Sequence, residues 1–327
     1  MTTYKEIRGT NIEAVASDPS NPVDGQVWYN TTTNVVKGLG FNSGSWSTGG
    51  ALNTGGYSVA ASGYGTQSAM LGFGGYSGPP GARLARTELY NGANWTEVND
   101  LNTGRYRLVG AGTSTSALAI GGYTSGVENK TELWNGTNWT AVNTLNTARD
   151  RLGAAGVSNT SALAFGGNQQ PPFSSALTEL WNGTNWTEVN DINTGRVSQD
   201  GGAGIATAAL FFGGSPNSAL TETWNGTNWT EVNDLNTGRN YLAGCGATNT
   251  AALAAGGNPP NLALTESWNG TNWTEVGDLN VGRQNVSGGG VNTAAIVFGG
   301  NGGSAGAYST ATEEFNVGPT TVTFSTS

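Results

Sequence analysis

Five arginines recur at regular intervals, and a catalytic site built on them would also need a nucleophile and an acid. Each follows Asn-Thr-Gly or a close variant of it: Arg105, Arg149, Arg196, Arg239 and Arg283. If the repeats close into a ring, these arginines could surround the mouth of its central channel. The chain also repeats an acid in the same register, at Glu132, Glu179, Glu222 and Glu266. Because catalysis needs an asymmetric constellation, we expect each arginine to anchor a turn or to pair with an acid.

Other groups that could do chemistry are scarce. The chain has no histidine, so a histidine-dependent zinc site or catalytic triad cannot be assembled. Its single cysteine, Cys245, stands where other repeats have Ala111, Ala155 and Ala203, and reads as a small buried residue. No Gly-x-x-x-x-Gly-Lys-[Ser/Thr] motif occurs. We therefore expect a protein that is not an enzyme, without a cofactor or metal.

Composition and net charge limit the classes of partner that we expect for this chain. Glycine accounts for 53 of 327 residues and charged residues for 11%, which is typical of an all-β chain dense in turns. A net charge of −9 repels a phosphate backbone, so no nucleic-acid partner is expected. The start of the chain has no apolar core of a secretion signal, and no run of about 18 apolar residues occurs. We expect no signal peptide and no membrane insertion.

Internal repeats determine the fold prediction. Glycine doublets recur every 43 to 47 residues, a length typical of propeller blades, at Gly74, Gly121, Gly166, Gly213, Gly256 and Gly299. A short apolar strand precedes each doublet, and a hairpin with an Asn-Gly turn follows it. Paired aromatics in the hairpins, such as Trp134 and Trp139, are expected to pack one blade on the next. Strands of small residues, such as 109–112, are expected nearest the axis.

The repeats predict an all-β fold: a six-bladed β-propeller of four-stranded antiparallel blades with an extended N-terminal arm. The last repeat supplies a strand at 312–316 but lacks the Trp-bearing strand that follows it elsewhere. Residues 45–52 match the missing strand, so pairing of N- and C-terminal strands is expected to close the ring. The predicted domains are an arm, 1–40, and a propeller, 41–327.

An apolar strand that ends in a Gly doublet and is followed by spaced aromatics resembles the kelch repeat, over about residues 41–316. The spacing Trp-Asn-Gly-Thr-Asn-Trp is shorter than in the kelch pattern, and successive copies are nearly identical. Such uniform repeats resemble kelch-like proteins encoded by marine bacteriophages. Residues 16–38 are similar to a short hairpin module of phage tail and fibre proteins. Kelch-like propellers include a copper radical oxidase, and six-bladed propellers include sialidases, but the copper ligands are missing here.

The two faces of the predicted propeller differ in uniformity. The turns inside the hairpins are nearly constant, whereas the loops after the Gly doublets differ in length and chemistry. We call the surface formed by these loops and by the turns that carry the repeated arginines the variable face, and we expect it to contact a ligand. The alternative is that the sequences of these exposed loops vary freely because the loops contact no ligand. The candidate contacts are Tyr76, Arg83, Arg86, Tyr123, Gln169, Gln170, Phe173, Asn217, Asn258, Tyr308, Arg107, Asp150, Gln199, Asp200 and Tyr241.

The arm is polar, Pro-punctuated and too small for a core of its own. A hairpin of residues 26–30 and 34–38 is expected to need a partner or the propeller's flank, with Trp28, Tyr29 and Lys37 as candidate docking residues; the alternative is a disordered leader.

These features, with the resemblance, favour a non-enzymatic virion structural and adhesion protein, a tail fibre or capsid decoration. It would be assembled in the host cytoplasm, would dock on other virion proteins through the arm, and would bind a host-surface protein or glycan, with a homo-oligomer possible. The alternatives are a cellular protein-interaction scaffold and, third, a glycan-processing propeller enzyme.

Overall fold

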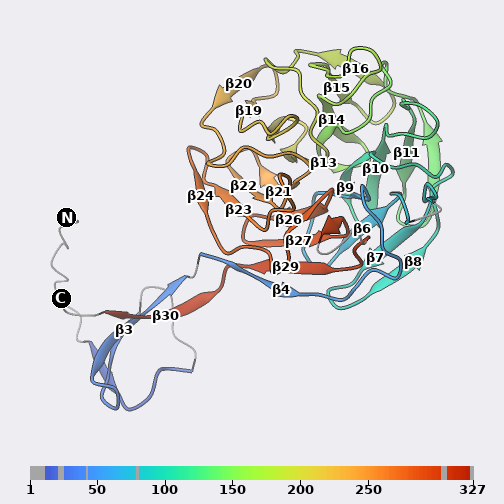
Figure 1. Ribbon diagram of the computed structural model, residues 1–327. Coiled ribbons are helices and arrows are strands. Elements are labelled where there is room, and N and C mark those ends of the chain that lie inside the picture. The colour runs from blue at the N-terminus through green and yellow to red at the C-terminus, as the bar shows by residue number, and fades with distance from the viewer. Residues whose placement is uncertain (1–11, 21–25, 42, 79–80, 303–307, 325–327) are drawn as a thin grey trace. The chain divides into compact units, whose positions relative to one another are not determined.

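The computed structural model describes residues 12–20, 26–41, 43–78, 81–302 and 308–324, and contains strands and turns but no helix within these ranges (Figure 1). The chain divides into two compact units, one of Met1–Gly44 with Val317–Ser327 and one of Ser45–Asn316. The first eleven residues, at which no signal peptide was predicted, lie outside the described ranges, as do parts of the loops that follow the first and the last Gly doublet.

The described residues form seven four-stranded sheets, so the predicted count of six is wrong for the chain. Six of these sheets are antiparallel, belong to Ser45–Asn316 and repeat one pattern that is consistent with a propeller. The seventh belongs to the terminal unit and contains a parallel pair. It escaped the repeat analysis because its strands carry no Gly doublet and no Trp hairpin, and it forms where the arm pairs with a C-terminal strand.

The first three repeated sheets follow the chain in order. The first is β5 (Ala60–Ala61), β6 (Met70–Phe73), β7 (Thr87–Tyr90) and β8 (Trp95–Val98). The second is β9 (Val109–Thr113), β10 (Ser116–Ile120), β11 (Thr131–Trp134) and β12 (Trp139–Val142). The third is β13 (Gly153–Ser158), β14 (Ser161–Phe165), β15 (Thr178–Trp181) and β16 (Trp186–Val189).

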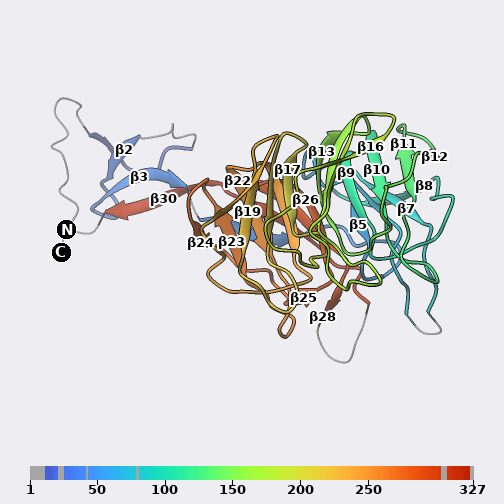
Figure 2. The ribbon, with the colours of Figure 1, turned by 90° about the horizontal axis from the view of Figure 1, so that it is seen from above.

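The next two sheets repeat this order. The fourth is β17 (Gly202–Ile205), β18 (Ala208–Phe212), β19 (Thr221–Trp224) and β20 (Trp229–Val232). The fifth is β21 (Ala243–Thr248), β22 (Ala251–Ala255), β23 (Thr265–Trp268) and β24 (Trp273–Glu275). A small two-stranded sheet of β25 (Arg283–Gln284) and β28 (Asn301–Gly302) lies at one edge of the unit in Figure 2.

The last repeated sheet joins distant parts of the chain. It consists of β26 (Ser287–Val291), β27 (Ala294–Phe298), β29 (Thr312–Asn316) and β4 (Ser45–Thr48). β4 pairs antiparallel with β29, with Trp46 opposite Phe315. The predicted use of residues 45–52 as the missing fourth strand is therefore confirmed, although the strand ends at Thr48. The C-terminal segment assigned to the propeller instead contributes β30 to the terminal unit.

The inner strands of the repeated sheets pack around a common centre (Figure 1). Each inner strand contacts the next one. The order of contacts is β5, β9, β13, β17, β21 and β26, and β26 in turn contacts β5. Small residues are needed here because neighbouring backbones nearly touch. A Cβ on Gly110 would lie 1.9 Å from the carbonyl oxygen of Ala61, and one on Gly244 would lie 2.3 Å from that of Gly202. Cys245 is buried among these strands, and burial raises the pKa of its thiol.

Each repeated sheet is tied to its neighbour by a buried hydrogen bond from a tryptophan. The indole Nε1 of Trp139 donates to the Thr87 hydroxyl of the preceding sheet at 2.9 Å. The same bond recurs as Trp186 to Thr131, Trp229 to Thr178, Trp273 to Thr221, Trp46 to Thr265 and Trp95 to Thr312. The last bond joins the first sheet to the last, so the series returns to its start. The predicted role of these tryptophans in packing is confirmed.

The five repeated arginines are buried and pair with glutamates. Arg105 Nη1 lies 2.6 Å from Glu132 Oε1, and Asn102 of the same turn donates its backbone and side-chain N–H groups to Glu132 Oε2 at 2.7 Å. The same pair recurs as Arg149 with Glu179, Arg196 with Glu222, Arg239 with Glu266 and Arg283 with Glu313. Burial lowers the pKa of Arg105 while Glu132 raises it. The arginines thus anchor turns, as predicted, and do not ring a mouth.

In the first repeat, a different arginine occupies the position of the turn arginine. It has Gly56 where the other repeats have the turn arginine. The guanidinium of Arg86 fills this place: a Cβ on Gly56 would lie 2.8 Å from its Nη2, and its Nη1 donates to the backbone carbonyl of Thr54 and lies 3.7 Å from Glu88. Arg86, a predicted ligand contact, is therefore buried in the framework.

The terminal unit is a sheet of β1 (Glu13–Val15), β2 (Val27–Asn30), β3 (Val35–Phe41) and β30 (Pro319–Phe324). The predicted hairpin exists as β2 and β3, and β30 pairs antiparallel with β3. Trp28 is fully buried and donates its indole N–H to Asp18. Hydrogen bonds from Lys37, Asn30 and Trp28 lower the pKa of Asp18 to about 2.

Replacing Arg149 with methionine should leave the Glu179 carboxylate buried without its cation, which costs about 3–5 kcal/mol. The free energy of unfolding, measured by urea denaturation, should fall by that amount. Arg83→Met is the matched control, because Arg83 is exposed and forms no ion pair among the described residues; it should change the free energy by about 0.5 kcal/mol or less. Equal effects of the two substitutions would contradict the role of the buried pair.

Candidate functional site

The loops and turns of the variable face meet in pairs. In several repeats the residue that follows the turn arginine, or its equivalent, forms a backbone bridge with the residue that follows the Gly doublet: Tyr57 with Tyr76, Tyr106 with Tyr123, Asp150 with Asn168, and Asn240 with Asn258. β25 and β28 pair in the same way in the last repeat. The two kinds of connection therefore lie together on one face, whereas the hairpin turns are uniform, with Asn91 Oδ1 accepting two backbone N–H groups and its counterparts doing the same.

One residue of each turn adopts positive φ near the common centre. The set is Ser58, Arg107, Arg151, Asp200, Tyr241 and Asn285, with φ between 52° and 64°. Backbone N–H groups link neighbouring members: Ser58 donates to Asn285, Asn285 to Tyr241, Arg151 to Arg107, and Arg107 to Ser58. Asp200 makes the link differently, since Gly244 donates to its carbonyl. Left-handed backbone in bulky residues is unfavourable and persists where the surroundings enforce it, often at functional sites.

The six turns that carry these positive-φ residues form a ring, and we call Gln199 and Asp200, which occupy its centre, the polar plug. The turn that carries them is one residue longer than the corresponding turn from Arg105 to Gly110. The Ser58 hydroxyl donates to Gln199 Oε1 at 3.0 Å across the ring, and the Ser287 hydroxyl donates to Asp200 Oδ2. Both plug residues are buried. The plug therefore ties the fourth repeat to the first and to the last.

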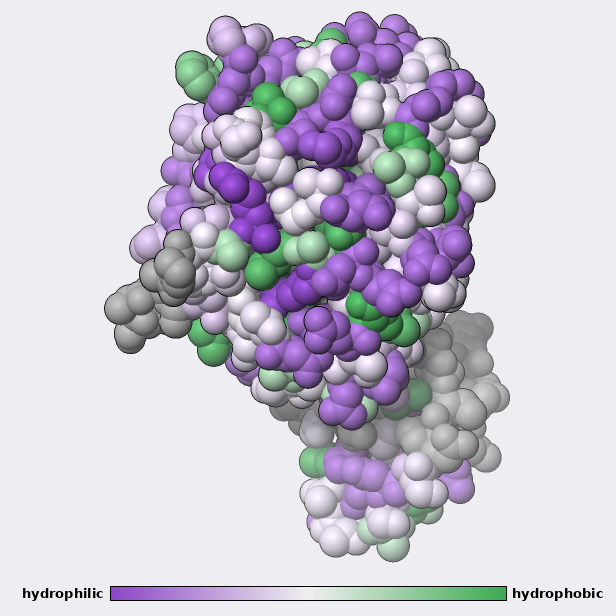
Figure 3. Space-filling view, turned by 90° about the vertical axis from the view of Figure 1, so that its right-hand side faces the viewer, coloured by the Kyte–Doolittle hydropathy of each residue, from purple (hydrophilic) through white to green (hydrophobic). Residues whose placement is uncertain are grey.

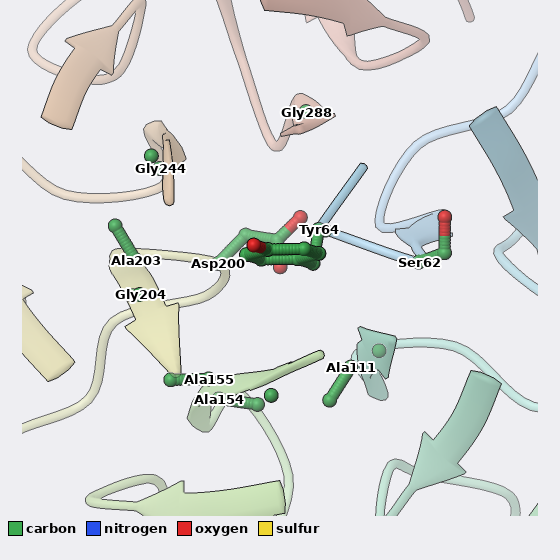
Figure 4. Close-up of a pocket in the computed structure, with 15 residues that line it drawn as sticks. Ser62, Tyr64, Ala111, Ala154, Ala155, Asp200, Ala203, Gly204, Gly244 and Gly288 are labelled. Atoms are coloured by element: carbon green, nitrogen blue, oxygen red, sulfur yellow. The ribbon is translucent and has the colours of Figure 1, made fainter. Parts of the chain in front are cut away.

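Below the plug, the inner strands enclose a cavity of about 20 Å³, room for about one water molecule. Figure 4 shows the side chains of Asp200 and Tyr64 over its centre, with Ser62, Ala111, Ala155 and Ala203 around it. Burial raises the pKa of Asp200 to about 7, and the hydrogen bonds from Ser287 and Gly288 oppose the rise. With so little space, the centre cannot admit a ligand.

A cluster of five tyrosines lies beside the plug: Tyr57, Tyr76, Tyr106, Tyr123 and Tyr308. Tyr57 stacks on Tyr308 with ring centroids 5.3 Å apart, and Tyr106 contacts Tyr76 at 5.0 Å and Tyr123 at 5.6 Å. All five side chains are half-buried. Burial raises the pKa of Tyr57, and the neighbouring tyrosines add to the rise.

One arginine contacts this tyrosine cluster, and a second lies on the neighbouring turn, where its backbone N–H donates to the first. The Arg107 guanidinium lies 4.8 Å from the ring centroid of Tyr106 and 5.7 Å from that of Tyr123, and its Nη1 is 3.5 Å from Asp150 Oδ2. Arg151 reaches from the third repeat to the fifth, where it lies 5.8 Å from the Tyr241 ring centroid. Burial raises the pKa of Asp150, and hydrogen bonding with Asn168 opposes this. The face thus has an aromatic side and a polar, cationic side.

The structure places the predicted contacts in different settings. It brings Tyr76, Tyr123, Tyr308, Arg107 and Asp150 together, and it buries Gln199, Asp200 and Arg86. Arg83 is exposed and its backbone forms a bridge with that of Tyr76. Gln170, Phe173 and Asn217 are also exposed, Gln169 donates to Ser175, and Asn258 and Tyr241 are half-buried. Their part in ligand binding remains a prediction, as does docking by Trp28, Tyr29 and Lys37. Tyr57, Tyr106, Arg151 and Asn285 were missed, although each follows the turn arginine position by one or two residues.

Among the described residues, the face drawn in Figure 3 gives no second candidate. In the view of Figure 3, hydrophobic residues form small separate groups among hydrophilic ones. Among the described residues, no group of three His, Cys, Asp or Glu side chains could hold a metal ion. The described part of the chain also contains no helix that is long and apolar enough to cross a membrane.

Comparison with known proteins adds no relative: no protein-family model matches the chain, and no curated protein matches it.

Stability should depend on pH through Asp200. Its pKa rises from 3.8 to about 7 on folding, so the folded state binds the proton more tightly and the group's contribution to stability is lost as the pH rises from about 4 to about 7. Asp200→Asn should remove this loss and should raise the free energy of unfolding at about pH 8 by up to about 4 kcal/mol. Urea denaturation at several pH values measures both effects.

Glu97→Gln, at an exposed carboxylate, is the matched control and should follow the pH dependence of the unchanged protein. Asp200 would not be a buried titrating group if Asp200→Asn also followed that dependence.

Proposed function

We propose that this chain is a non-enzymatic structural and adhesion protein of a bacteriophage virion, with the variable face turned to a ligand on the host surface. In this proposal, the six antiparallel sheets of Ser45–Asn316 form one closed, kelch-like propeller. Three observations support closure: inner-strand contacts that return to their start, tryptophan bonds that do the same, and the pairing of β4 with β29. A rigid ring of this kind lets loops vary without disturbing the core.

The observation that carries the adhesion role is the gathering of five half-buried tyrosines and two arginines on the variable face. Exposed aromatic and arginine side chains are enriched where proteins bind partners. The hairpin turns of the other face repeat one Asn-Gly arrangement and offer no comparable cluster among the described residues. We therefore assign ligand contact to the variable face.

The terminal unit supports the virion assignment. It is a separate compact unit in which β30 completes the sheet begun by the arm, and it contains the segment that resembles a phage fibre module. We propose that this sheet docks on another virion protein. The setting in a phage particle comes from the resemblance of the repeats and of this module, and not from the geometry of the face.

The virion assignment is tested by particle composition. Mass spectrometry of purified phage particles should detect the chain at a constant copy number, and deletion of residues 1–44 should abolish its incorporation while Ser45–Asn316 keeps its fold by circular dichroism. An arm-deleted protein that still copurifies with particles would reject docking through the terminal unit. A chain found only free in the cytosol would favour the cellular scaffold instead.

A further inference from the structure

We infer that the variable face binds the terminal sugar of a glycan that carries a carboxylate, with the sugar ring on the tyrosine cluster and the carboxylate at Arg107 and Arg151. This inference rests on the proposed function only in assigning ligand contact to the variable face. It does not depend on where the protein is assembled or on how the arm docks.

The tyrosine cluster has the chemistry that recognises a sugar ring. Aromatic rings bind the apolar C–H face of a pyranose, while hydroxyls at their edges bond to its hydroxyl groups. The hydroxyls of Tyr57, Tyr76, Tyr106 and Tyr308 bond to no other described residue, and only that of Tyr123 reaches a backbone carbonyl, at 3.4 Å. The cluster therefore offers four hydroxyls to a polar ligand.

The two arginines differ from the five arginines of the framework. Each framework arginine is buried and faces a glutamate, but the Arg107 side chain is 26% exposed and shares Asp150 at 3.5 Å, outside strong hydrogen-bond distance. Arg151 has no carboxylate within 4.0 Å among the described residues. Their backbones are joined by the 2.8 Å bond from Arg151 to Arg107. Two guanidinium groups on neighbouring turns interact with the single carboxylate of Asp150, which leaves positive charge for an anionic group.

The floor of the site determines how a ligand can enter. Gln199 and Asp200 close the centre, and the cavity below holds about 20 Å³, so a chain cannot thread through the ring. Polar atoms of the plug and of the turns and loops around it are buried without a hydrogen-bond partner: Gln199 Nε2, Asn240 Oδ1 and Asn261 Oδ1. Water molecules can bridge such atoms to ligand hydroxyls. A shallow site with a polar floor fits the end of a glycan.

The test uses the full-length protein and two oligosaccharides by isothermal titration calorimetry: one that ends in a hexuronic acid, and the same compound with its carboxyl reduced to a hydroxymethyl group. The acidic compound should bind at least tenfold more tightly than the reduced one. Arg151→Gln should weaken binding of the acidic compound about tenfold and should leave the reduced compound unaffected. Tyr106→Leu should weaken both.

Lys130→Gln is the control, since it removes a positive charge that pairs with Glu128 outside the proposed site, and it should not change binding. Equal affinity for the two compounds would overturn the carboxylate assignment, and binding of neither would overturn the whole inference. Neither of these two calorimetric results affects whether the chain is found in phage particles. The proposed virion role would fail separately, if the chain were absent from particles although it still bound the acidic compound.

Discussion

The bond from a tryptophan indole to a threonine hydroxyl of the neighbouring sheet is the interaction on which the framework depends. Five of the six threonines, such as Thr131, are followed by a glutamate that pairs with a turn arginine, and Thr87 is followed by Glu88, which faces Arg86. One dipeptide thus satisfies buried donors from two directions: the hydroxyl accepts from the next sheet, and the carboxylate accepts from the preceding turn. Because an unpaired buried polar group costs about 1–3 kcal/mol, neither side chain can be changed alone without loss. The repeats are uniform where this dipeptide and its partners lie.

Much of this framework could be predicted from the sequence because its signals are local and repeated. Gly doublets, Asn-Gly turns and paired aromatics each recur at a fixed spacing, and the arginine and glutamate recur in register. The seventh sheet has no such signal. β30 reads Pro-Thr-Thr-Val-Thr-Phe, a short polar segment that becomes a strand only because β3 offers an unpaired edge. The use of Arg86 in place of a missing turn arginine was equally hidden, since it depends on the space left above Gly56.

The candidate site was predicted less well for the same physical reason. Its members come from repeats far apart in the chain, and only the arrangement of those repeats around one centre brings Tyr57 against Tyr308. The bond between Ser58 and Gln199 spans 141 residues and exists because one turn has a single extra residue. The repeats are close to symmetric, but this insertion and the tyrosines make the face asymmetric. Recognition of one ligand requires such asymmetry on a symmetric frame.

The pairing of β4 with β29 also has a mechanical consequence. Ser45 lies opposite Asn316 in this pair, and Phe41 lies opposite Pro319 in the pairing of β3 with β30, so both connections between the two units leave from neighbouring positions. Tension between the two units is therefore shared by two connections, one into β4 and one out of β29, and it enters the single sheet to which both strands belong. The other five repeated sheets lie outside that path, and a pull on the terminal unit does not have to pass through them. A protein built this way can be tethered through its terminal unit while the strands of those five sheets keep their geometry.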